Sequence, residues 1–332
     1  MSWHISTDEP APFELLNPST VDQALDFGAK HNRDAAYLAG GCDLYEQLKH
    51  NWSTYHYVIN LKQISGMRGV EIRDSAVTIG ALTKLGDLEQ NTQLAQIHPG
   101  LVHAATRVAT PQIRNMGTIG GNILQDSRCF YYRGPWYCYR AGGIVCDAHH
   151  GVNSEHAIFG GNRCFTVSPS DTGTMLVALD AVAHIRGLEG DRSISMGQLF
   201  VQPQEDIRVM HRLRPDEILT SVEVPRQAGQ RSTFIKYAMR NSWDFAVASV
   251  AISFRQEGGA CRECRIVLGA VAATPWRSQS AERVMEGEPL TPDNIEAAAR
   301  AATEGAQPLA YNEYKIPLVR KLVREALMEL SK

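Results

Sequence analysis

Four cysteines in one glycine- and aromatic-rich stretch constrain this chain more than any other feature. They are Cys129, Cys138, Cys146 and Cys164, out of seven cysteines in 332 residues. In a chain that is not secreted, thiols gathered in this way are more often metal ligands than disulfides. Their spacing has neither the close C-x-x-C pairs of zinc ribbons nor the C-x-x-C-x-x-C run of bacterial ferredoxins. The intervening glycines allow sharp turns, so distant thiolates can still converge on one metal centre.

The histidines and aromatic residues of the same stretch are not expected to be metal ligands. His149, His150 and His156 are expected to be exposed or to lie behind the ligands. Aromatic side chains are expected to form an apolar jacket around the centre: Phe130, Tyr131, Tyr132, Trp136, Tyr137, Tyr139 and Phe159. Structural zinc and unligated thiols are the alternatives. Cys261 and Cys264 are excluded from the site, because residues three apart in a strand point to opposite faces, one buried and one exposed.

Composition excludes several classes of protein. A hydrophobic content of 44% and a charged content of 21% are ordinary for a globular protein of two or three domains. The net charge of −3 provides no basic field for nucleic acid or anionic lipid. No apolar run approaches the roughly 20 residues of a membrane helix. Residues 1–8 are neither basic nor apolar, so no signal peptide is expected. The expected location is the cytoplasm, or the periplasm if a signal-bearing partner carries the chain there.

Apolar patterning predicts mixed helix and sheet. A strand at 35–38, a glycine turn, a helix at 45–49 and a strand at 57–61 form a βαβ-like unit. Residues 70–72 and 77–79 alternate as a hairpin. The polar segment 227–232 predicts a domain boundary, giving domains 1–226 and 227–332. Beyond it, strands are expected at 234–239, 246–254 and 264–271, followed by helices ending with 316–330.

Two glycine turns predict a dinucleotide site. In Leu38-Ala39-Gly40-Gly41-Cys42-Asp43-Leu44, paired glycines follow a strand and let backbone amides approach phosphate oxygens. Gly117-Thr118-Ile119-Gly120-Gly121-Asn122 repeats this pattern and adds a hydroxyl and an amide. Neither turn has the G-x-G-x-x-G of a Rossmann domain, so that fold is not expected.

With two further motifs the chain resembles a known family. A-G-G-C-D-L, R-N-M-G-T-I-G-G-N, S-P-S-D (168–171) and K-Y-A-M-R-N-S-W-D-F-A (236–246) are similar to the FAD-binding subunit of xanthine oxidase-type molybdenum hydroxylases. The resemblance implies an α+β fold: a vanillyl-alcohol oxidase (PCMH)-type FAD-binding domain of two subdomains, about 1–62 and 63–226, and a C-terminal domain of the CO dehydrogenase flavoprotein type.

The resemblance also implies which residues hold FAD. The two glycine turns and Thr110 would hold its pyrophosphate and ribose, Asp171 would accept a hydrogen bond from it, and Leu219 would line the flavin. Lys236 would lie near the flavin ring, where a cation favours the reduced, anionic form. Without the resemblance, Lys236 and Asp244 would be interpreted as a surface pair. Cys42 departs from the family, which usually has threonine or serine there, and its thiol is expected to pack or to be reactive.

The insertion at 126–167 resembles the [4Fe-4S] loop of a minority branch, the aldehyde oxidoreductase and 4-hydroxybenzoyl-CoA reductase type. The four cysteines would then be the cluster ligands. The implied partners are a large molybdopterin-binding subunit and a small [2Fe-2S] subunit, with a ferredoxin-like protein or a nicotinamide nucleotide as external acceptor. The implied function is electron transfer between the partner clusters, FAD and that acceptor. Aldehydes are the first expected substrate class, followed by purines or other N-heterocycles and by aromatic acyl-CoA esters. A stand-alone FAD-dependent oxidase and a zinc-stabilised scaffold are the alternatives from other classes.

Overall fold

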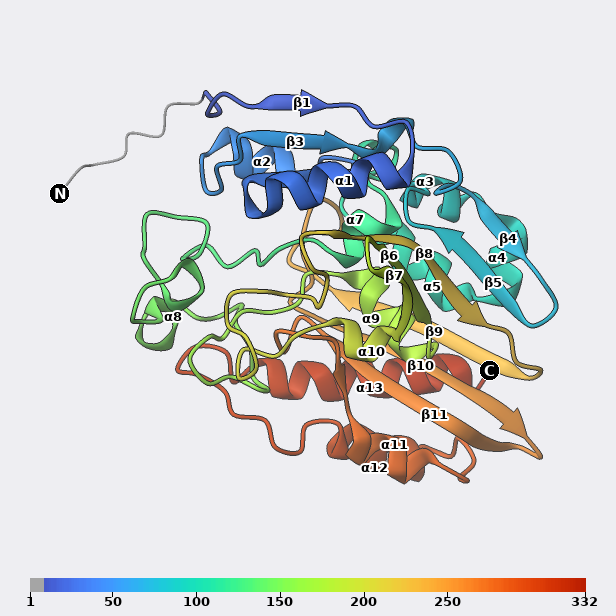
Figure 1. The fold of residues 1–332 in the computed structure, drawn as a ribbon. Coiled ribbons are helices and arrows are strands. Elements are labelled where there is room, and N and C mark those ends of the chain that lie inside the picture. Colours follow the sequence, from blue (N-terminus) through green and yellow to red (C-terminus); the bar gives the residue numbers. More distant parts are fainter. Residues whose placement is uncertain (1–8) are drawn as a thin grey trace.

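A computed structural model describes residues 9–332 as three sheets with helices packed around and between them (Figure 1). Residues 1–8, on which the expectation about a signal peptide rests, lie outside the described part. The three sheets use consecutive stretches of the chain, and the division after residues 62 and 226 stays a prediction. Within the described range, no helix combines the length and apolar character that crossing a membrane requires.

The N-terminal sheet contains the predicted βαβ unit. Strands β1 (Glu14–Leu16), β3 (Tyr57–Asn60) and β2 (Ala35–Leu38) lie in that order and are parallel. Helix α1 (Val21–His31) begins where the Thr20 hydroxyl accepts a hydrogen bond from the Gln23 amide at 3.2 Å. Helix α2 (Leu44–Lys49) follows the first glycine turn, so this turn lies at the C-terminal end of β2.

The middle sheet is antiparallel, in the order β4-β5-β8-β6-β7. Its strands are β4 (Val70–Ile72), β5 (Ala76–Gly80), β6 (Val182–Gly187), β7 (Gly190–Ser195) and β8 (Glu217–Pro225). Its helices are α3 (Leu85–Glu89), α4 (Thr92–Ile97), α5 (Pro99–Thr106), α6 (Pro111–Arg114), α7 (Ile119–Ile123), α9 (Asp171–Ala178) and α10 (Met196–Leu199). The first two strands confirm the predicted hairpin.

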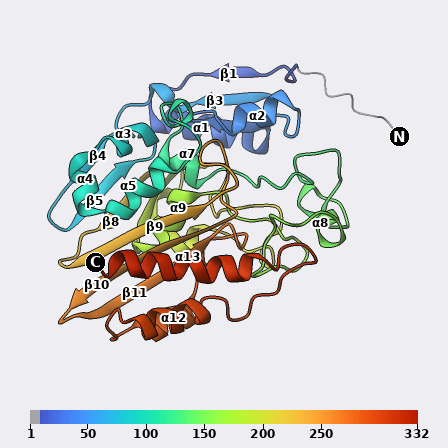
Figure 2. The same cartoon turned by 180° about the vertical axis from the view of Figure 1, so that it is seen from behind.

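The C-terminal unit is an antiparallel sheet in the order β12-β11-β10-β9 that carries the last helices (Figure 2). The strands are β9 (Gln230–Tyr237), β10 (Ala248–Glu257), β11 (Ala260–Gly269) and β12 (Trp276–Arg277). The helices are α11 (Gln279–Met285), α12 (Pro292–Ala301) and α13 (Lys315–Leu330). The turn between β10 and β11 falls at Gly258 and Gly259, as the sequence predicts, and both glycines have positive φ.

The prediction that one of Cys261 and Cys264 is buried and the other exposed is wrong. Both side chains are 1% exposed and belong to the C-terminal core. The pairing of β10 with β11 shifts register between Ser253 and Arg255, and Glu263 has a φ of 52°. This bulge inserts an extra residue between the two cysteines, so that strict alternation fails and both side chains reach the same buried side.

Helix α9 lies at the centre of the molecule. It packs against α5 and α7 on one side and against β10 and β11 on the other. The long connection from α7 to α9 extends to one side of the sheets and contains η3 (Tyr139–Ala141) and α8 (Asp147–His150) (Figures 1 and 2). This connection, residues 124–170, is called the cysteine loop below.

The buried residue His98 is expected to make the stability of the fold depend on pH under acidic conditions. His98, between α4 and α5, is fully buried, and neither ring nitrogen has a hydrogen-bond partner. Burial lowers its pKa from 6.5 to about 4. Between these two values the unfolded chain binds more protons than the folded chain, so stability falls as the pH falls. The loss attributable to this residue is up to about 3 kcal/mol.

We therefore expect His98→Leu to reduce the loss of stability between pH 7 and pH 4.5. The measurement is the free energy of unfolding from urea titrations of both proteins at the two pH values. An identical pH dependence in the variant would mean that His98 does not carry a proton-linked penalty.

Candidate flavin and metal sites

The two predicted glycine turns lie in direct contact. A Cβ atom on Gly40 would lie 2.5 Å from the Met116 carbonyl oxygen and 2.8 Å from the Cα of Gly117. Both are backbone atoms that cannot move aside as a flexible side chain would. Gly41 has a φ of +87°, which side chains disfavour. Close contact with the second turn therefore requires glycine at position 40, and the backbone conformation favours glycine at position 41.

The second turn is tied to helix α9. Thr118 caps α7, and its hydroxyl accepts a hydrogen bond from the Gly121 amide at 3.1 Å. The Asn122 side-chain oxygen accepts hydrogen bonds from the Ser170 hydroxyl at 2.9 Å and the Thr172 hydroxyl at 2.6 Å. The S-P-S-D motif is thereby attached to the glycine turn.

Other residues that were predicted to contact FAD have local structural roles. Gly120 packs on Ala81, whose carbonyl oxygen would lie 2.8 Å from a Cβ there, so close packing explains this glycine. Thr110 caps α6 by accepting a hydrogen bond from the Ile113 amide at 3.3 Å. Leu219, in β8, is buried in the main core. Desolvation raises the pKa of the Cys42 thiol, which disfavours the reactive thiolate.

We expect Gly40→Ala to weaken FAD binding. The added methyl group must push the two turns apart, and overpacking of this kind costs about 1–3 kcal/mol. Fluorescence titration of the flavin-free protein with FAD should show a Kd about 10- to 100-fold higher. Gly197→Ala is the matched control, because a Cβ there meets only a side-chain carbon at 3.9 Å. An unchanged Kd for Gly40→Ala would contradict a flavin site between the turns.

Asp171 and Lys236 form a buried ion pair. Their side chains are 7% and 3% exposed, and Lys236 Nζ lies 2.7 Å from Asp171 Oδ2. Nζ also donates to the Arg107 carbonyl oxygen at 3.0 Å. Burial raises the pKa of the Asp171 carboxyl, although the neighbouring ammonium opposes this rise. The alternative surface pair with Asp244 is wrong, because Asp244 contacts Arg240 instead.

Asp43 joins the first glycine turn to the cysteine loop. Its carboxylate lies 2.7 Å from Arg128 Nη1 and 2.6 Å from the buried Arg133 Nη2. It also accepts a hydrogen bond from the Asp126 amide at 3.0 Å. Asp43 therefore anchors the start of the loop beside the glycine turns, a role that sequence reasoning missed.

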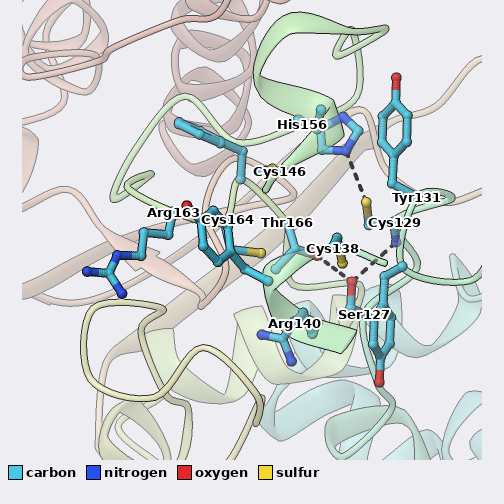
Figure 3. A pocket seen from close by; sticks show the side chains of 14 residues that line it. Ser127, Cys129, Tyr131, Cys138, Arg140, Cys146, His156, Arg163, Cys164 and Thr166 are labelled. Carbon is cyan, nitrogen blue, oxygen red and sulfur yellow. Dashed lines mark hydrogen bonds between the residues drawn. The ribbon is translucent and has the colours of Figure 1, made fainter. Parts of the chain in front are cut away.

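The four predicted cysteines line one cavity (Figure 3). Its empty space, including the part open to solvent, is about 310 Å³. Across residues 9–332, no three His, Cys, Asp or Glu side chains are arranged as a ready metal site. Burial raises the pKa of Cys129 to about 12 and raises that of Cys146. The protonated form of these two thiols is thus favoured, and metal binding would have to displace their protons.

A buried cation faces the same cavity. The Arg140 side chain is 1% exposed, and its Nε and Nη1 atoms have no hydrogen-bond partner. The nearest carboxylate, that of Asp126, is 3.7 Å from Nη1. Asp126 and the Val209 carbonyl oxygen, which accepts from Nη2 at 3.4 Å, compensate this buried guanidinium only in part. The cavity is therefore suited to an anionic group such as a thiolate-ligated metal centre.

A second cavity adjoins the first. Its empty space, including the part open to solvent, is about 650 Å³, and its lining includes Asp171 and Phe245. Cys129, His156 and Thr166 line both cavities. The cavity with the four thiols and the cavity with the predicted flavin residue therefore share one wall.

The predicted aromatic jacket forms only in part. Tyr131, Tyr132 and Tyr139 line the cysteine cavity. Phe159 instead stacks on Trp276, with ring centroids 5.0 Å apart, in the C-terminal core. Tyr137 is 70% exposed. His149 and His150 are exposed, as expected. An aromatic-rich segment does not reveal which rings face inwards, because its backbone follows no regular period.

Two regions of the chain match known families. Residues 11–227 match the FAD binding domain in molybdopterin dehydrogenase, and residues 233–330 match the CO dehydrogenase flavoprotein C-terminal domain. The chain is 30% identical over 301 residues to the aldehyde oxidoreductase FAD-binding subunit of Escherichia coli K12, covering 89% of this chain and 91% of that protein. It is 27% identical over 325 residues to 6-hydroxypseudooxynicotine dehydrogenase complex subunit alpha of Paenarthrobacter nicotinovorans, covering 96% and 94%.

The fold agrees with solved structures. One structure of carbon monoxide dehydrogenase from Hydrogenophaga pseudoflava matches with a TM-score of 0.76 and 26% identity, covering 96% of this chain and 97% of that chain. The predicted fold class is thereby confirmed. These matches, and the motifs that the fold brings together, show that the chain belongs to the FAD-binding subunits of xanthine oxidase-family molybdenum hydroxylases, which are oxidoreductases.

Proposed function

We propose that this chain is the flavin and iron–sulfur electron-transfer subunit of a multi-subunit aldehyde-oxidising molybdenum hydroxylase. It would bind FAD and one [4Fe-4S] cluster, and would connect the [2Fe-2S] clusters of a small partner with an external acceptor. The observation that carries this proposal is the wall shared by the four-cysteine cavity and the cavity lined by Asp171. Two redox groups on either side of that wall would be close neighbours.

The residues suited to FAD are those of the two glycine turns, together with Asp171 in the lining of the second cavity and its partner Lys236. Backbone amides of the two turns would face the phosphates, since the Gly40–Gly117 contact brings the turns together. Asp171 would accept a hydrogen bond, and Lys236 would hold that carboxylate in place and supply positive charge near the ring. Bound FAD supplies a carrier that accepts electrons in pairs or singly.

The residues suited to the cluster are Cys129, Cys138, Cys146 and Cys164. Four thiolates are the ligand set of a [4Fe-4S] centre, and Arg140 would offset its negative charge. Zinc with four thiolates has the same charge, so Arg140 does not distinguish the two. The wall shared with the second cavity favours iron, because a zinc site next to a flavin would have no redox role.

Similarity supports the aldehyde assignment. The relative at 30% identity belongs to an aldehyde oxidoreductase, and another relative is a glyceraldehyde dehydrogenase medium chain. Relatives that are subunits of a xanthine dehydrogenase, of 6-hydroxypseudooxynicotine dehydrogenase and of nicotine 6-hydroxylase make N-heterocycles the second class to test. A large molybdopterin-binding partner would select the substrate.

The external acceptor is proposed to be a ferredoxin-like protein. Exposed apolar side chains on the cysteine loop provide a contact surface next to the cluster: Trp136, Tyr137, Ile144 and Val145. A nicotinamide nucleotide approaching the flavin is the alternative. Stopped-flow reoxidation of the reduced complex by each acceptor distinguishes them.

The experiment that tests the function is affinity purification from the native host, with metal, flavin and turnover measurements. The expected result is co-purifying molybdenum, FAD and roughly eight irons per assembly, from two [2Fe-2S] clusters and one [4Fe-4S] cluster. Aldehydes should be oxidised faster than purines or pyridines. Isolation of the chain without partners, with turnover of a simple alcohol, would instead identify a stand-alone oxidase.

A further inference from the structure

We propose that His156 is a positioning residue that donates its Nε2–H to the Cys129 sulfur and raises the reduction potential of the metal centre. This inference rests on the proposed [4Fe-4S] cluster. It concerns a residue that belongs to neither the ligand set nor the flavin motifs.

The first step is the contact. His156 Nε2 lies 3.2 Å from Cys129 Sγ, within hydrogen-bond distance for sulfur (Figure 3). The ring is 3% exposed, and Nδ1 has no hydrogen-bond partner. A neutral imidazole has one N–H, and a thiolate sulfur can only accept. The tautomer with the proton on Nε2 therefore satisfies the sulfur of a ligating cysteine.

The second step is the rigidity of the ring. The backbone oxygen of His156 accepts a hydrogen bond from the fully buried Asn312 side chain at 3.0 Å. The ring also packs near Phe130 and Tyr131, with centroid distances of 5.8 and 6.0 Å. The C-terminal unit thus holds the backbone of His156, while neighbouring aromatic rings restrict the movement of its imidazole. A hydrogen bond held in this way does not depend on a mobile side chain.

The third step is the electronic consequence. A hydrogen bond to a cluster sulfur withdraws electron density and stabilises the reduced, more negative form, so the potential rises. Of the four cysteines, Cys129 is the one that also lines the cavity of the predicted flavin residue Asp171. His156 would therefore favour the presence of an electron on the cluster rather than on its neighbours.

The test is a potentiometric titration of the purified complex, followed by low-temperature EPR, which separates the clusters by their signals. His156→Leu should lower the ratio of reduced to oxidised [4Fe-4S] cluster about tenfold at the wild-type midpoint, which corresponds to a shift of about 59 mV. His156→Gln keeps an N–H donor and should recover part of this shift. His150→Gln, an exposed histidine of the same loop, is the control and should leave the potential unchanged.

The possible results distinguish failure of this inference from failure of the proposed function. A cluster with an unchanged potential in His156→Leu overturns the inference and leaves the proposed function intact, whereas wild-type protein without a [4Fe-4S] cluster overturns both. If His156→Leu fails to fold, the wild-type complex labelled with ¹⁵N-histidine provides the second measurement. Pulsed EPR of the reduced cluster should show coupling to one histidine ring nitrogen and to one exchangeable proton, and absence of these couplings overturns the inference.

Discussion

Replacing Cys138 by alanine is expected to abolish the spectrum of the proposed [4Fe-4S] cluster. Cys138 is buried in the cavity that all four cysteines line, so no water-exposed group can easily take its place as a ligand. A cubane with three remaining thiolates is unstable in air. Bound iron should fall from the roughly four atoms of the proposed cluster to about three or fewer, because the iron without a thiolate ligand is lost first. The measurements are iron analysis and the broad visible absorption of the cluster.

The matched control for this prediction is Cys42→Ser. Cys42 lies at the first glycine turn, outside the cysteine cavity, so its replacement should leave bound iron unchanged. Iron in Cys138→Ala equal to that of the wild type would refute the ligand assignment. One zinc per chain in place of iron would support the structural-zinc alternative.

Replacing Lys236 by methionine is expected to destabilise the fold by about 3–5 kcal/mol at pH 8, because a buried carboxylate loses its partner. Asp171 is almost wholly buried, and Lys236 Nζ is 2.7 Å from it. Burial already raises the pKa of Asp171 in the folded chain, and without the opposing ammonium this pKa should rise further above its unfolded value. The folded chain then binds more protons, so the loss of stability should grow as the pH rises and diminish toward acidic pH. Urea titrations at pH 5 and pH 8 measure both effects.

Two comparisons separate the ion pair from other effects of this substitution. The double variant Lys236→Met with Asp171→Leu removes both charges and should recover most of the lost stability. Lys321→Met removes an exposed lysine whose partner, Glu325, is also exposed, and should cost less than about 1 kcal/mol. A similar small cost for Lys236→Met would show that the buried pair contributes little.

Local patterns predict much of this fold. The strand, glycine turn and helix from Ala35 to Lys49 follow from apolar runs and from the flexibility of Gly40 and Gly41. The hairpin at residues 70–80 and the Gly258–Gly259 turn follow from alternation and from turn residues. The β11 bulge does not, because Glu263 adopts its positive φ within a sheet whose partner strand the sequence does not reveal. The wrong prediction for the exposure of Cys261 and Cys264 is a direct result of this bulge.

In the candidate site, too, local sequence patterns predict some features and miss others. Spacing and residue type identify the four thiols that line one cavity, and two glycine turns that prove to touch. The Asp43–Arg133, Asp171–Lys236 and Cys129–His156 contacts join residues 27 to 90 positions apart. No local period encodes such contacts, so the sequence alone points to the ligands but not to the side chains that hold or neutralise them.

The central claim is that the four cysteines hold an iron cubane beside the flavin. The most direct measurement is the Mössbauer spectrum of the purified complex from cells grown on ⁵⁷Fe. The account predicts roughly eight irons per assembly, half of them in the delocalised environment of a [4Fe-4S] cluster and half in [2Fe-2S] clusters. A spectrum with only [2Fe-2S] iron would contradict it.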